Sequence, residues 1–265
     1  MSGIVTTGEK RLVLASGRAH PVLAQEVSEE LGVEVLPMDA WDFANGEIYV
    51  RYGESVRGTD AFLLQSHPAP INTWLMENLI MIDALKRASA KRITAIAPSF
   101  PYARQDKKHR GREPISARLV ADLYETAGVD RMISVDLHAP QVQGYFAKPV
   151  DHLMALPILA DYVAAKYDHE DLAVVSPDAG RIRVAEQWAK RLGGVSLSFI
   201  HKSRDPNRPN QAIAKRVIGE VTGKTCILVD DMIDTAGTIV QAADALVANG
   251  AESVDRKSTR LNSSH

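Results

Sequence analysis

Short apolar runs rich in β-branched residues alternate along the chain with longer segments whose apolar residues recur every three or four positions. The short runs predict strands and the longer segments predict amphipathic helices. Strands that alternate with helices are typical of parallel sheets flanked by helices. The expected strands lie at 11–15, 61–65, 92–97, 131–135, 172–175, 195–200 and 225–229.

The clearest helical segment covers residues 72–88, where Asn72 or Thr73 is placed to cap the first turn. Its apolar residues fall on one helical face: Leu75, Leu79, Ile82 and Leu85. Two further helices are expected over 115–127 and 236–248. A glycine follows each of them closely, as is common where helices end.

The alternation of strands and helices occurs twice, once up to about residue 155 and again from about residue 156. The sequence therefore predicts an α/β protein with two consecutive domains, 1–155 and 156–255, each a mainly parallel sheet flanked by helices. A chain of 265 residues is long enough for two such domains.

The end of the chain departs from this pattern. Residues 250–254 are typical of a helix end that leads into another strand, but residues 256–265 carry no apolar periodicity. One interpretation is a natural disordered tail. We favour a truncated reading frame followed by a foreign, non-native tail over 256–265.

Composition excludes several classes of function. The chain is 45% hydrophobic and 24% charged, with a formal net charge of -2 and a pI near 6.5. This balance argues against a general nucleic-acid binder or a protein of the membrane surface. No stretch reaches the ~18 consecutive apolar residues that indicate a membrane span, and the first eleven residues lack the apolar core of a signal peptide.

Cys226 is the sole cysteine, which rules out a disulfide within the chain and disfavours a cysteine-based zinc site. It lies in an apolar run and is expected to be a small buried hydrophobic residue. These features favour a reducing compartment, and we expect a cytoplasmic protein.

An acidic loop follows the expected strand 225–229. It begins with Asp230 and Asp231, continues with Asp234-Thr235-Ala236-Gly237-Thr238, and leads into a helix. Backbone N–H groups at such a turn and helix start converge on an anion, the threonine hydroxyls add donors, and glycine lets the backbone approach closely. Paired carboxylates suit the neighbouring hydroxyls of a sugar. An ordinary acidic helix cap is the alternative, but the whole combination favours a sugar-phosphate site.

A second glycine-containing segment, 219–225, superficially matches a nucleotide-binding P-loop. It has three residues between its glycines where the motif needs four, and it precedes its strand where the motif follows one. Both differences exclude it.

Six basic residues crowd the segment 104–112. Alone, such a segment could be a solvated surface loop or a nucleic-acid patch. Because it follows a strand and precedes a helix, we predict a site for nucleotide phosphates. Further along, His138 comes two residues after Asp136 at a strand end, where it could reach a metal or a phosphate, although a lone histidine is more often structural.

These segments together resemble a known family. Residues 230–238 resemble the phosphoribosyl pyrophosphate loop of the type I phosphoribosyltransferase fold, and residues 136–151 closely resemble the signature of the ribose-phosphate pyrophosphokinases. Residues 43–48 and 101–115 resemble that family's adenine-binding segment and ATP-binding loop, and 199–206 resembles its mobile catalytic loop. The motifs occur in the family's order and the resemblance covers about residues 11–254. It implies two consecutive type I phosphoribosyltransferase-like domains.

The resemblance also implies a role for individual residues. ATP would be bound by Phe43, Asn45, Gly46, Glu47, Arg104 and Gln105. Ribose 5-phosphate would be bound by Arg204, Asp230, Asp231, Asp234, Thr235, Ala236, Gly237 and Thr238. Lys202 and Arg204 would be catalytic, in a loop that reads Lys-Ser-Arg where many relatives have Lys-Arg-Arg. Mg2+ would be bound by His138 and Asp178, with Asp136 and Asp151 as secondary candidates, although His138 could instead contact a phosphate.

The implied reaction is Mg2+-dependent transfer of the diphosphoryl group of ATP to ribose 5-phosphate, which gives AMP and 5-phosphoribosyl 1-diphosphate for nucleotide biosynthesis. The resemblance further implies a homo-oligomer, usually a hexamer, and no nucleic-acid or membrane partner. Two alternatives remain open here: a type I phosphoribosyltransferase, which would consume that product, and a non-catalytic regulatory relative that binds the synthetase.

Overall fold

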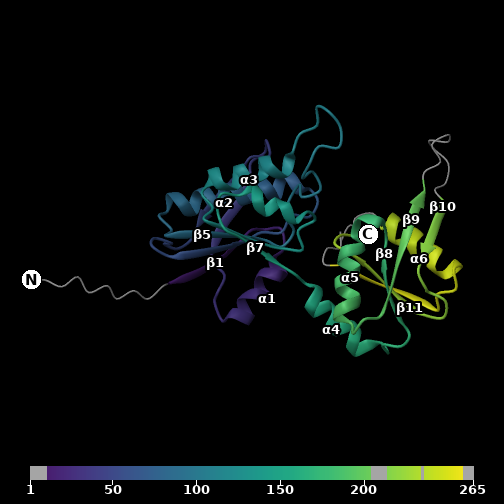
Figure 1. The fold of residues 1–265 in the computed structure, drawn as a ribbon. Coiled ribbons are helices and arrows are strands. Elements are labelled where there is room, and N and C mark those ends of the chain that lie inside the picture. The colour runs from purple at the N-terminus through teal and green to yellow at the C-terminus, as the bar shows by residue number, and fades with distance from the viewer. Residues whose placement is uncertain (1–10, 204–213, 234–235, 259–265) are drawn as a thin grey trace, which may run out of the picture. The chain divides into compact units, whose positions relative to one another are not determined.

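A computed structural model describes residues 11–203, 214–233 and 236–258. The chain divides into two compact units, 1–153 and 154–265, which are treated separately below. In each unit a five-stranded sheet carries helices on both faces (Figure 1).

The sheet of the first unit is parallel throughout. Its strands lie side by side in the order β1 (Leu12–Ser16), β4 (Asp60–Leu64), β5 (Arg92–Ala97), β6 (Arg131–Val135) and β7 (Val150–Leu153). Helices α2 (Ile71–Arg87) and α3 (Ser116–Ala127) pack against each other on one face. Helix α1 (Pro21–Leu31) lies on the other (Figure 1). A single core, which includes Leu63, Ile82, Leu85, Met132 and Tyr124, joins the sheet to α2 and α3.

Two smaller elements complete the first unit. Strands β2 (Met38–Asp42) and β3 (Ile48–Tyr52) form an antiparallel hairpin that is separate from the main sheet. The 3-10 helix η1 (Pro140–Tyr145) connects β6 to β7.

The second unit has the strand order β10 (Ala214–Ile218), β9 (Ser196–Ser203), β8 (Leu172–Ser176), β11 (Thr225–Asp230) and β12 (Ser253–Ser258). Only β10 among these described strands runs antiparallel to its neighbour. A short 3-10 turn, η2 (Ala179–Arg181), follows β8.

The central strands of the second unit are buried on both faces. Alternate residues of β8 and β11, such as Val175 and Leu228, pack toward α6 (Gly237–Ala248), while Val174 and Ile227 pack toward α4 (Leu156–Lys166) and α5 (Ile182–Arg191). This double burial explains why both strands read as continuous apolar runs. Cys226 is fully buried in β11, as the sequence predicts.

The α/β fold predicted from the sequence is confirmed. Each of the seven expected strands is found within one residue of its predicted ends, except that β9 extends three residues further, to Ser203. The expected cap of α2 is wrong. Pro70 occupies the N-cap position, while Asn72 lies inside the helix, where its side-chain oxygen accepts a hydrogen bond from the Tyr102 hydroxyl. Strand β12 reaches Ser258, so the first three residues of the predicted foreign tail are paired with β11.

A buried polar group links the ends of β4 and β5 in the first unit. His67 is buried, its Nδ1 donates to the Ser99 carbonyl oxygen at 3.2 Å, and its Nε2 lies 3.1 Å from the Tyr124 hydroxyl, which in turn accepts from Asn78 Nδ2 at 2.9 Å. Burial lowers the pKa of His67 to about 4, so the ring is neutral at pH 7.

This histidine should make the first unit acid-sensitive. In the unfolded chain this histidine is protonated below pH ~6.5, whereas in the folded chain it stays neutral down to pH ~4. Protonation therefore favours the unfolded state, and the free energy of unfolding falls as the pH drops from ~6.5 to ~4. We expect His67 to account for about 2 kcal/mol of lost unfolding free energy between pH 7.5 and 5. When unfolding by urea is measured at pH 7.5 and at pH 5, the His67→Gln variant should lose about 2 kcal/mol less unfolding free energy between the two than the unaltered chain does. The same loss as in the unaltered chain would contradict this, and His109→Gln, at an exposed position, is the control.

Candidate functional site

The turn between β2 and β3 brings together four of the residues predicted to bind ATP. Phe43 N donates to the Glu47 carbonyl at 2.8 Å, and Gly46 N donates to the Phe43 carbonyl at 2.8 Å. Gly46 has a φ of 87°, which favours glycine, and the Asn45 side chain accepts from Glu47 N at 3.1 Å. The turn is therefore closed by its own hydrogen bonds and presents its side chains to solvent.

Aromatic rings surround this turn. The rings of Trp41 and Tyr49 are stacked with centroids 4.0 Å apart, and Phe43 meets both edge-on at 6.4–6.5 Å. Phe43 nevertheless remains 48% exposed. An exposed ring on a rigid turn offers a flat apolar face to another planar group.

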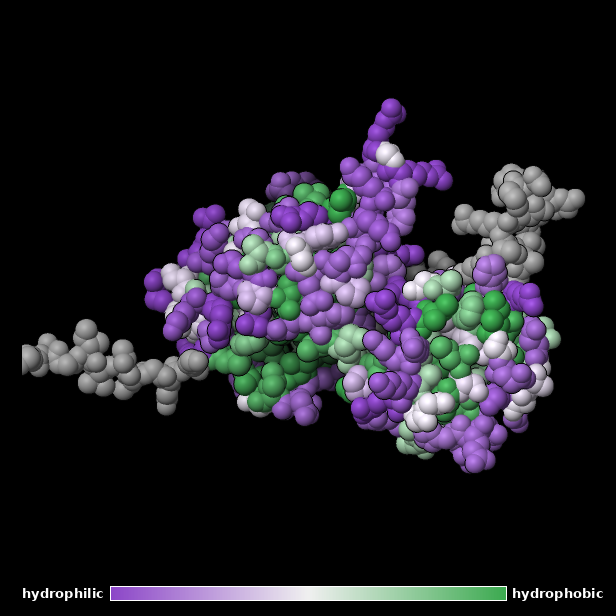
Figure 2. Space-filling view, in the orientation of Figure 1, coloured by the Kyte–Doolittle hydropathy of each residue, from purple (hydrophilic) through white to green (hydrophobic). Residues whose placement is uncertain are grey.

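Arg104 and Gln105 lie in the loop between β5 and α3, which stands out from the unit and is hydrophilic over its surface (Figures 1 and 2). Gln105 is fixed against the start of α3, because its carbonyl accepts from Ala117 N at 3.1 Å and its side-chain oxygen accepts from the Ser116 hydroxyl at 2.7 Å. Both Arg104 and Gln105 are exposed.

Asp106 ties this loop to the next strand connection. Its buried carboxylate accepts a hydrogen bond from Gln141, and its carbonyl accepts one from the Tyr145 hydroxyl, both in η1. The structure thus brings the predicted ATP-binding loop beside the 136–151 segment, because β5 and β6 are parallel neighbours and their carboxyl ends share one sheet edge.

Asp136 and His138 occupy the turn that directly follows β6. Asp136 has a φ of 42°, an uncommon conformation for a residue with a side chain. The next residue, Leu137, donates its N–H to His152 Nε2 at 2.9 Å. Asp136 and His138 are half-buried and lie two residues apart in this turn.

Asp151, the other secondary metal candidate, is engaged differently. Its two carboxylate oxygens accept from Arg131 Nη1 at 2.7 and 2.9 Å, across the pair β6–β7. This ion pair gives Asp151 a structural role that requires no metal.

In the second unit, Asp178 follows β8 at the carboxyl edge of the sheet. Its carboxylate caps η2 by accepting from Gly180 N at 2.9 Å, and its carbonyl accepts from the Ser176 hydroxyl at 2.6 Å. β8 and β11 are parallel neighbours, so Asp178 follows the same sheet edge as the acidic pair Asp230 and Asp231.

The structure adds a residue to this edge that the sequence analysis missed. Arg181, at the end of η2, places Nη2 2.8 Å from Asp231 Oδ1 and Nε 3.9 Å from Asp230 Oδ1. All three side chains are largely buried. Arg181 lies fifty residues from the acidic pair in sequence and belongs to no local motif, so only the pairing of β8 with β11 reveals it.

The acidic pair is electrostatically strained despite this arginine. Burial and the neighbouring Asp231 raise the pKa of Asp230 to about 7, while the Asp231 backbone N–H, 2.9 Å from Asp230 Oδ1, and Arg181 act in the opposite direction. At neutral pH the site therefore holds a carboxylate that gains from any additional hydrogen-bond donor or cation.

The remaining described part of the acidic loop leads into α6. Ala236 has a φ of 59° and accepts a hydrogen bond from Val240 N at 2.9 Å, and Gly237 and Thr238 form the exposed first turn of the helix. The backbone N–H groups of a first helical turn have no partner within the helix and point outward. This is an arrangement that accepts an anion.

Some predicted residues lie outside the described part of the chain. These are Arg204, Asp234 and Thr235. Lys202 belongs to β9, where its backbone pairs with Lys215 of β10, but its side chain is likewise outside the description.

Among the described residues, no three His, Cys, Asp or Glu side chains cluster closely enough to hold a metal by themselves. Mg2+ needs no such cluster, because it is usually held by one or two carboxylates together with substrate phosphates. Asp136 in the first unit and Asp178 in the second unit each carry oxygen donors of the kind that this mode uses. Within the described ranges, no helix is long and apolar enough to span a bilayer.

Comparison with known proteins matches both units of the chain to the same family. The family model described as the N-terminal domain of ribose phosphate pyrophosphokinase matches residues 12–128, and the phosphoribosyl transferase domain matches residues 152–256. The ribose-phosphate pyrophosphokinase of Streptomyces coelicolor is 66% identical over 254 residues, which cover 96% of this chain and 78% of the relative. The enzyme of that name from Mycobacterium tuberculosis H37Rv is 61% identical over 254 residues, which again cover 96% of this chain and 78% of the relative.

A solved structure agrees. The phosphoribosylpyrophosphate synthetase of Mycobacterium smegmatis has a TM-score of 0.91 and 62% identity, and the match covers 97% of this chain and 83% of that one. The predicted pair of phosphoribosyltransferase-like domains is thereby confirmed. The chain belongs to the ribose-phosphate pyrophosphokinase family.

Proposed function

We propose that the protein transfers the diphosphoryl group of ATP to the 1-hydroxyl of ribose 5-phosphate, which yields AMP and 5-phosphoribosyl 1-diphosphate. The observation that carries the proposal is family membership over both units, with relatives 61–66% identical that are named for this activity. In the reaction the 1-hydroxyl oxygen bonds to the β-phosphorus and loses its proton, while the bond from the β-phosphorus to the α-phosphate oxygen breaks and AMP leaves.

The second unit supplies the sugar-phosphate half of the proposal. The ribose hydroxyls donate to Asp230 and Asp231, and the first turn of α6, with Ala236, Gly237 and Thr238, receives the 5-phosphate. The raised pKa of Asp230 supports this assignment, because hydroxyl donors relieve a carboxylate that its neighbours destabilise. Asp234 and Thr235 complete the loop in this proposal.

Arg181 shares the acidic pair with the sugar in this arrangement. Its contact of 2.8 Å with Asp231 partly neutralises the two carboxylates before substrate arrives. When the ribose hydroxyls also donate to the two carboxylates, the guanidinium can be shared with a phosphate group, for which its planar donors are suited.

The first unit supplies the nucleotide half. Phe43 offers its exposed ring to the adenine base, Asn45, Gly46 and Glu47 bind around it, and Arg104 and Gln105 bind the ATP phosphates. Lys202 and Arg204 stabilise the negative charge that spreads over the transferring group.

Mg2+ is the implied cofactor and would neutralise charge on the ATP phosphates when bound. Asp178 fits its preference for oxygen, with Asp136 as a secondary ligand, and His138 would contact the ion, a metal-bound water or a phosphate. The Arg131 ion pair makes Asp151 the least suitable of the four. We further propose a cytoplasmic homo-oligomer, and a hexamer is the assembly that the resemblance implies.

The two alternatives receive less support. A phosphoribosyltransferase does not require the N-terminal domain that residues 12–128 match. A non-catalytic regulatory relative would be free to lose Lys202 and Arg204, and both are present.

The assay for the reaction combines the purified chain, Mg2+, ATP and ribose 5-phosphate. We expect AMP and 5-phosphoribosyl 1-diphosphate in equal amounts, with no product when Mg2+ is chelated. ADP formation in place of AMP, or no reaction by a folded protein, would contradict the proposal.

Replacement of Lys202 tests the catalytic role. Lys202→Ala should lower kcat by about 10²–10³, the usual cost of one charge-stabilising donor, with little change in ATP affinity. Lys190→Ala, at an exposed position of α5, is the matched control and should keep full activity. Near-normal turnover of the Lys202 variant would remove the assignment.

Carbon NMR titration of the Asp230 carboxyl tests the electrostatics of the acidic pair. Asp231→Asn removes a neighbouring negative charge and should lower the Asp230 pKa from about 7, whereas Arg181→Gln removes a positive charge and should raise it. Asp244→Asn, exposed on α6, should leave it unchanged. Shifts of the opposite sign would show that the three groups do not interact as described.

A further inference from the structure

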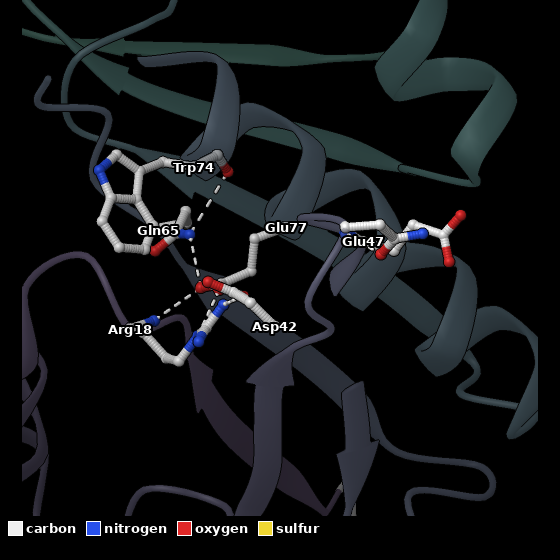
Figure 3. A network of polar contacts seen from close by, with 7 residues as sticks. Arg18, Asp42, Glu47, Gln65, Trp74 and Glu77 are labelled. Atoms are coloured by element: carbon white, nitrogen blue, oxygen red, sulfur yellow. Dashed lines mark hydrogen bonds and ion pairs between the residues drawn. The ribbon is translucent and has the colours of Figure 1, made fainter. Parts of the chain in front are cut away.

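In the first unit, an ion pair with a fully buried carboxylate lies beside the end of the strand that leads into the turn carrying Phe43 and Glu47. Arg18, two residues after β1, donates its backbone N–H to Glu77 Oε1 at 2.8 Å and its Nε to Glu77 Oε2 at 2.6 Å (Figure 3). The same guanidinium reaches away from α2, and its Nη2 lies 2.6 Å from Asp42 Oδ1. One arginine therefore connects the middle of α2 to the end of β2.

Glu77 is fully buried, so its charge depends on protein donors alone. Gln65, at the end of β4, provides another, with Nε2 3.0 Å from Glu77 Oε1. Gly17 makes room for this glutamine, because a Cβ at that position would lie 2.2 Å from Gln65 Oε1. The residue pair Gly17-Arg18 thus fits around Glu77 in a way that a larger residue at 17 would not allow.

Stability alone gives little reason to keep this arrangement. Desolvation of a carboxylate costs several kcal/mol, and well-packed apolar residues of similar volume usually stabilise a protein as well or better. Buried ion pairs are better explained where they fix one geometry. Here the geometry being fixed is the direction of the Arg18 side chain, because Glu77 Oε1 holds the Arg18 backbone N–H and Glu77 Oε2 holds its Nε.

Asp42 contacts the Arg18 side chain close to the turn of the hairpin 38–52. It is the last residue of β2, it pairs with Ile48, and it directly precedes Phe43. The base of the hairpin is held elsewhere, by a hydrogen bond of 3.1 Å from the Tyr52 hydroxyl to the Met81 carbonyl in α2. The Arg18–Asp42 contact therefore braces the turn end of the hairpin, where the aromatic side chains are exposed.

We infer that Arg18 is a positioning residue for nucleotide binding: held by buried Glu77, it fixes Asp42 and with it the turn 43–47. This inference rests on the proposed function, in which that turn receives the adenine base. Arg18 itself touches no substrate. Its loss should weaken the base contact without altering the chemistry or the sugar site.

The test compares two aspartates of one strand. Asp42→Ala removes the brace, whereas Asp39→Ala removes an ion pair inside the hairpin, to Arg51 at 3.7 Å, in which both side chains are more than 60% exposed. Both changes lie on the surface and should leave the fold intact. In the Asp42 variant we expect KM for ATP to rise about five- to tenfold, the effect of one charge-assisted hydrogen bond, with kcat and KM for ribose 5-phosphate within twofold. Discrimination between ATP and GTP should also fall. The Asp39 variant should match the unaltered chain in all four quantities.

A double-mutant cycle and hydrogen exchange complete the design. Arg18→Gln should reproduce the Asp42 effect, and the Arg18→Gln/Asp42→Ala double variant should be no worse than either single variant. Without substrates, the amides of Phe43 and Gly46, which are hydrogen-bonded within the turn, should exchange faster in the Asp42 variant than in the Asp39 variant.

Equal KM for ATP in the Asp42 and Asp39 variants would overturn the inference, and so would an equal rise in KM for both substrates. If the unaltered chain made no product, the proposed function would fail instead. The exchange comparison would then still decide the structural claim, because equal exchange in the two variants would show that Arg18 does not hold the turn.

Discussion

Hydrogen bonding between parallel strands is the constraint on which the candidate sites depend. Parallel neighbours end at a common edge of their sheet. Several described candidates of both units follow such ends, whereas the candidates 43–47 lie on the separate antiparallel hairpin. Gln105 and His138 come after β5 and β6, and Asp178 and Asp230 come after or at the ends of β8 and β11. The same pairing brings Arg181 to Asp231, which sequence separation alone would keep apart. The candidate residues at these edges are thus brought together by the topology of the sheets, which the buried apolar residues of the strands fix.

Prediction from sequence succeeded where burial dictates pattern. The inner residues of β8 and β11 are buried on both faces and are therefore apolar or small, so each strand forms a clear apolar run in the sequence. The hairpin strands were missed because β2 reads Met-Asp-Ala-Trp-Asp and is half-exposed throughout, so no core imposes a pattern on it. The cap of α2 was mispredicted because the chain enters the helix through Pro70, and Asn72 bonds to Tyr102 in a different loop. The candidate site residues that belong to motifs could be named from the sequence and stay predictions. Arg18 and Arg181 contact residues that are distant in sequence, so they leave no local trace.

The two arginine–carboxylate groups show how one kind of contact serves two purposes. Glu77 has donors on both oxygens, from the Arg18 backbone, the Arg18 side chain and Gln65, all at 2.6–3.0 Å. Asp230 has one backbone donor at 2.9 Å, and Arg181 Nε at 3.9 Å is too far for a hydrogen bond. The first carboxylate is therefore saturated and can only hold structure. The carboxylate of Asp230 has fewer donors than its burial requires, and its pKa is accordingly raised to about 7. A further hydrogen-bond donor would therefore stabilise it.

That difference separates residues that bind from residues that position. A ligand hydroxyl adds little to Glu77, because it would have to displace a donor that is already well placed, and solvent does not reach the carboxylate. The same hydroxyl adds much to Asp230, where it relieves repulsion from Asp231 in a partly desolvated site. A buried carboxylate beside an arginine is thus not by itself a sign of function. The number of short donors that it already has decides whether it awaits a substrate, as we propose for Asp230, or fixes a neighbour, as we propose for Glu77 through Arg18.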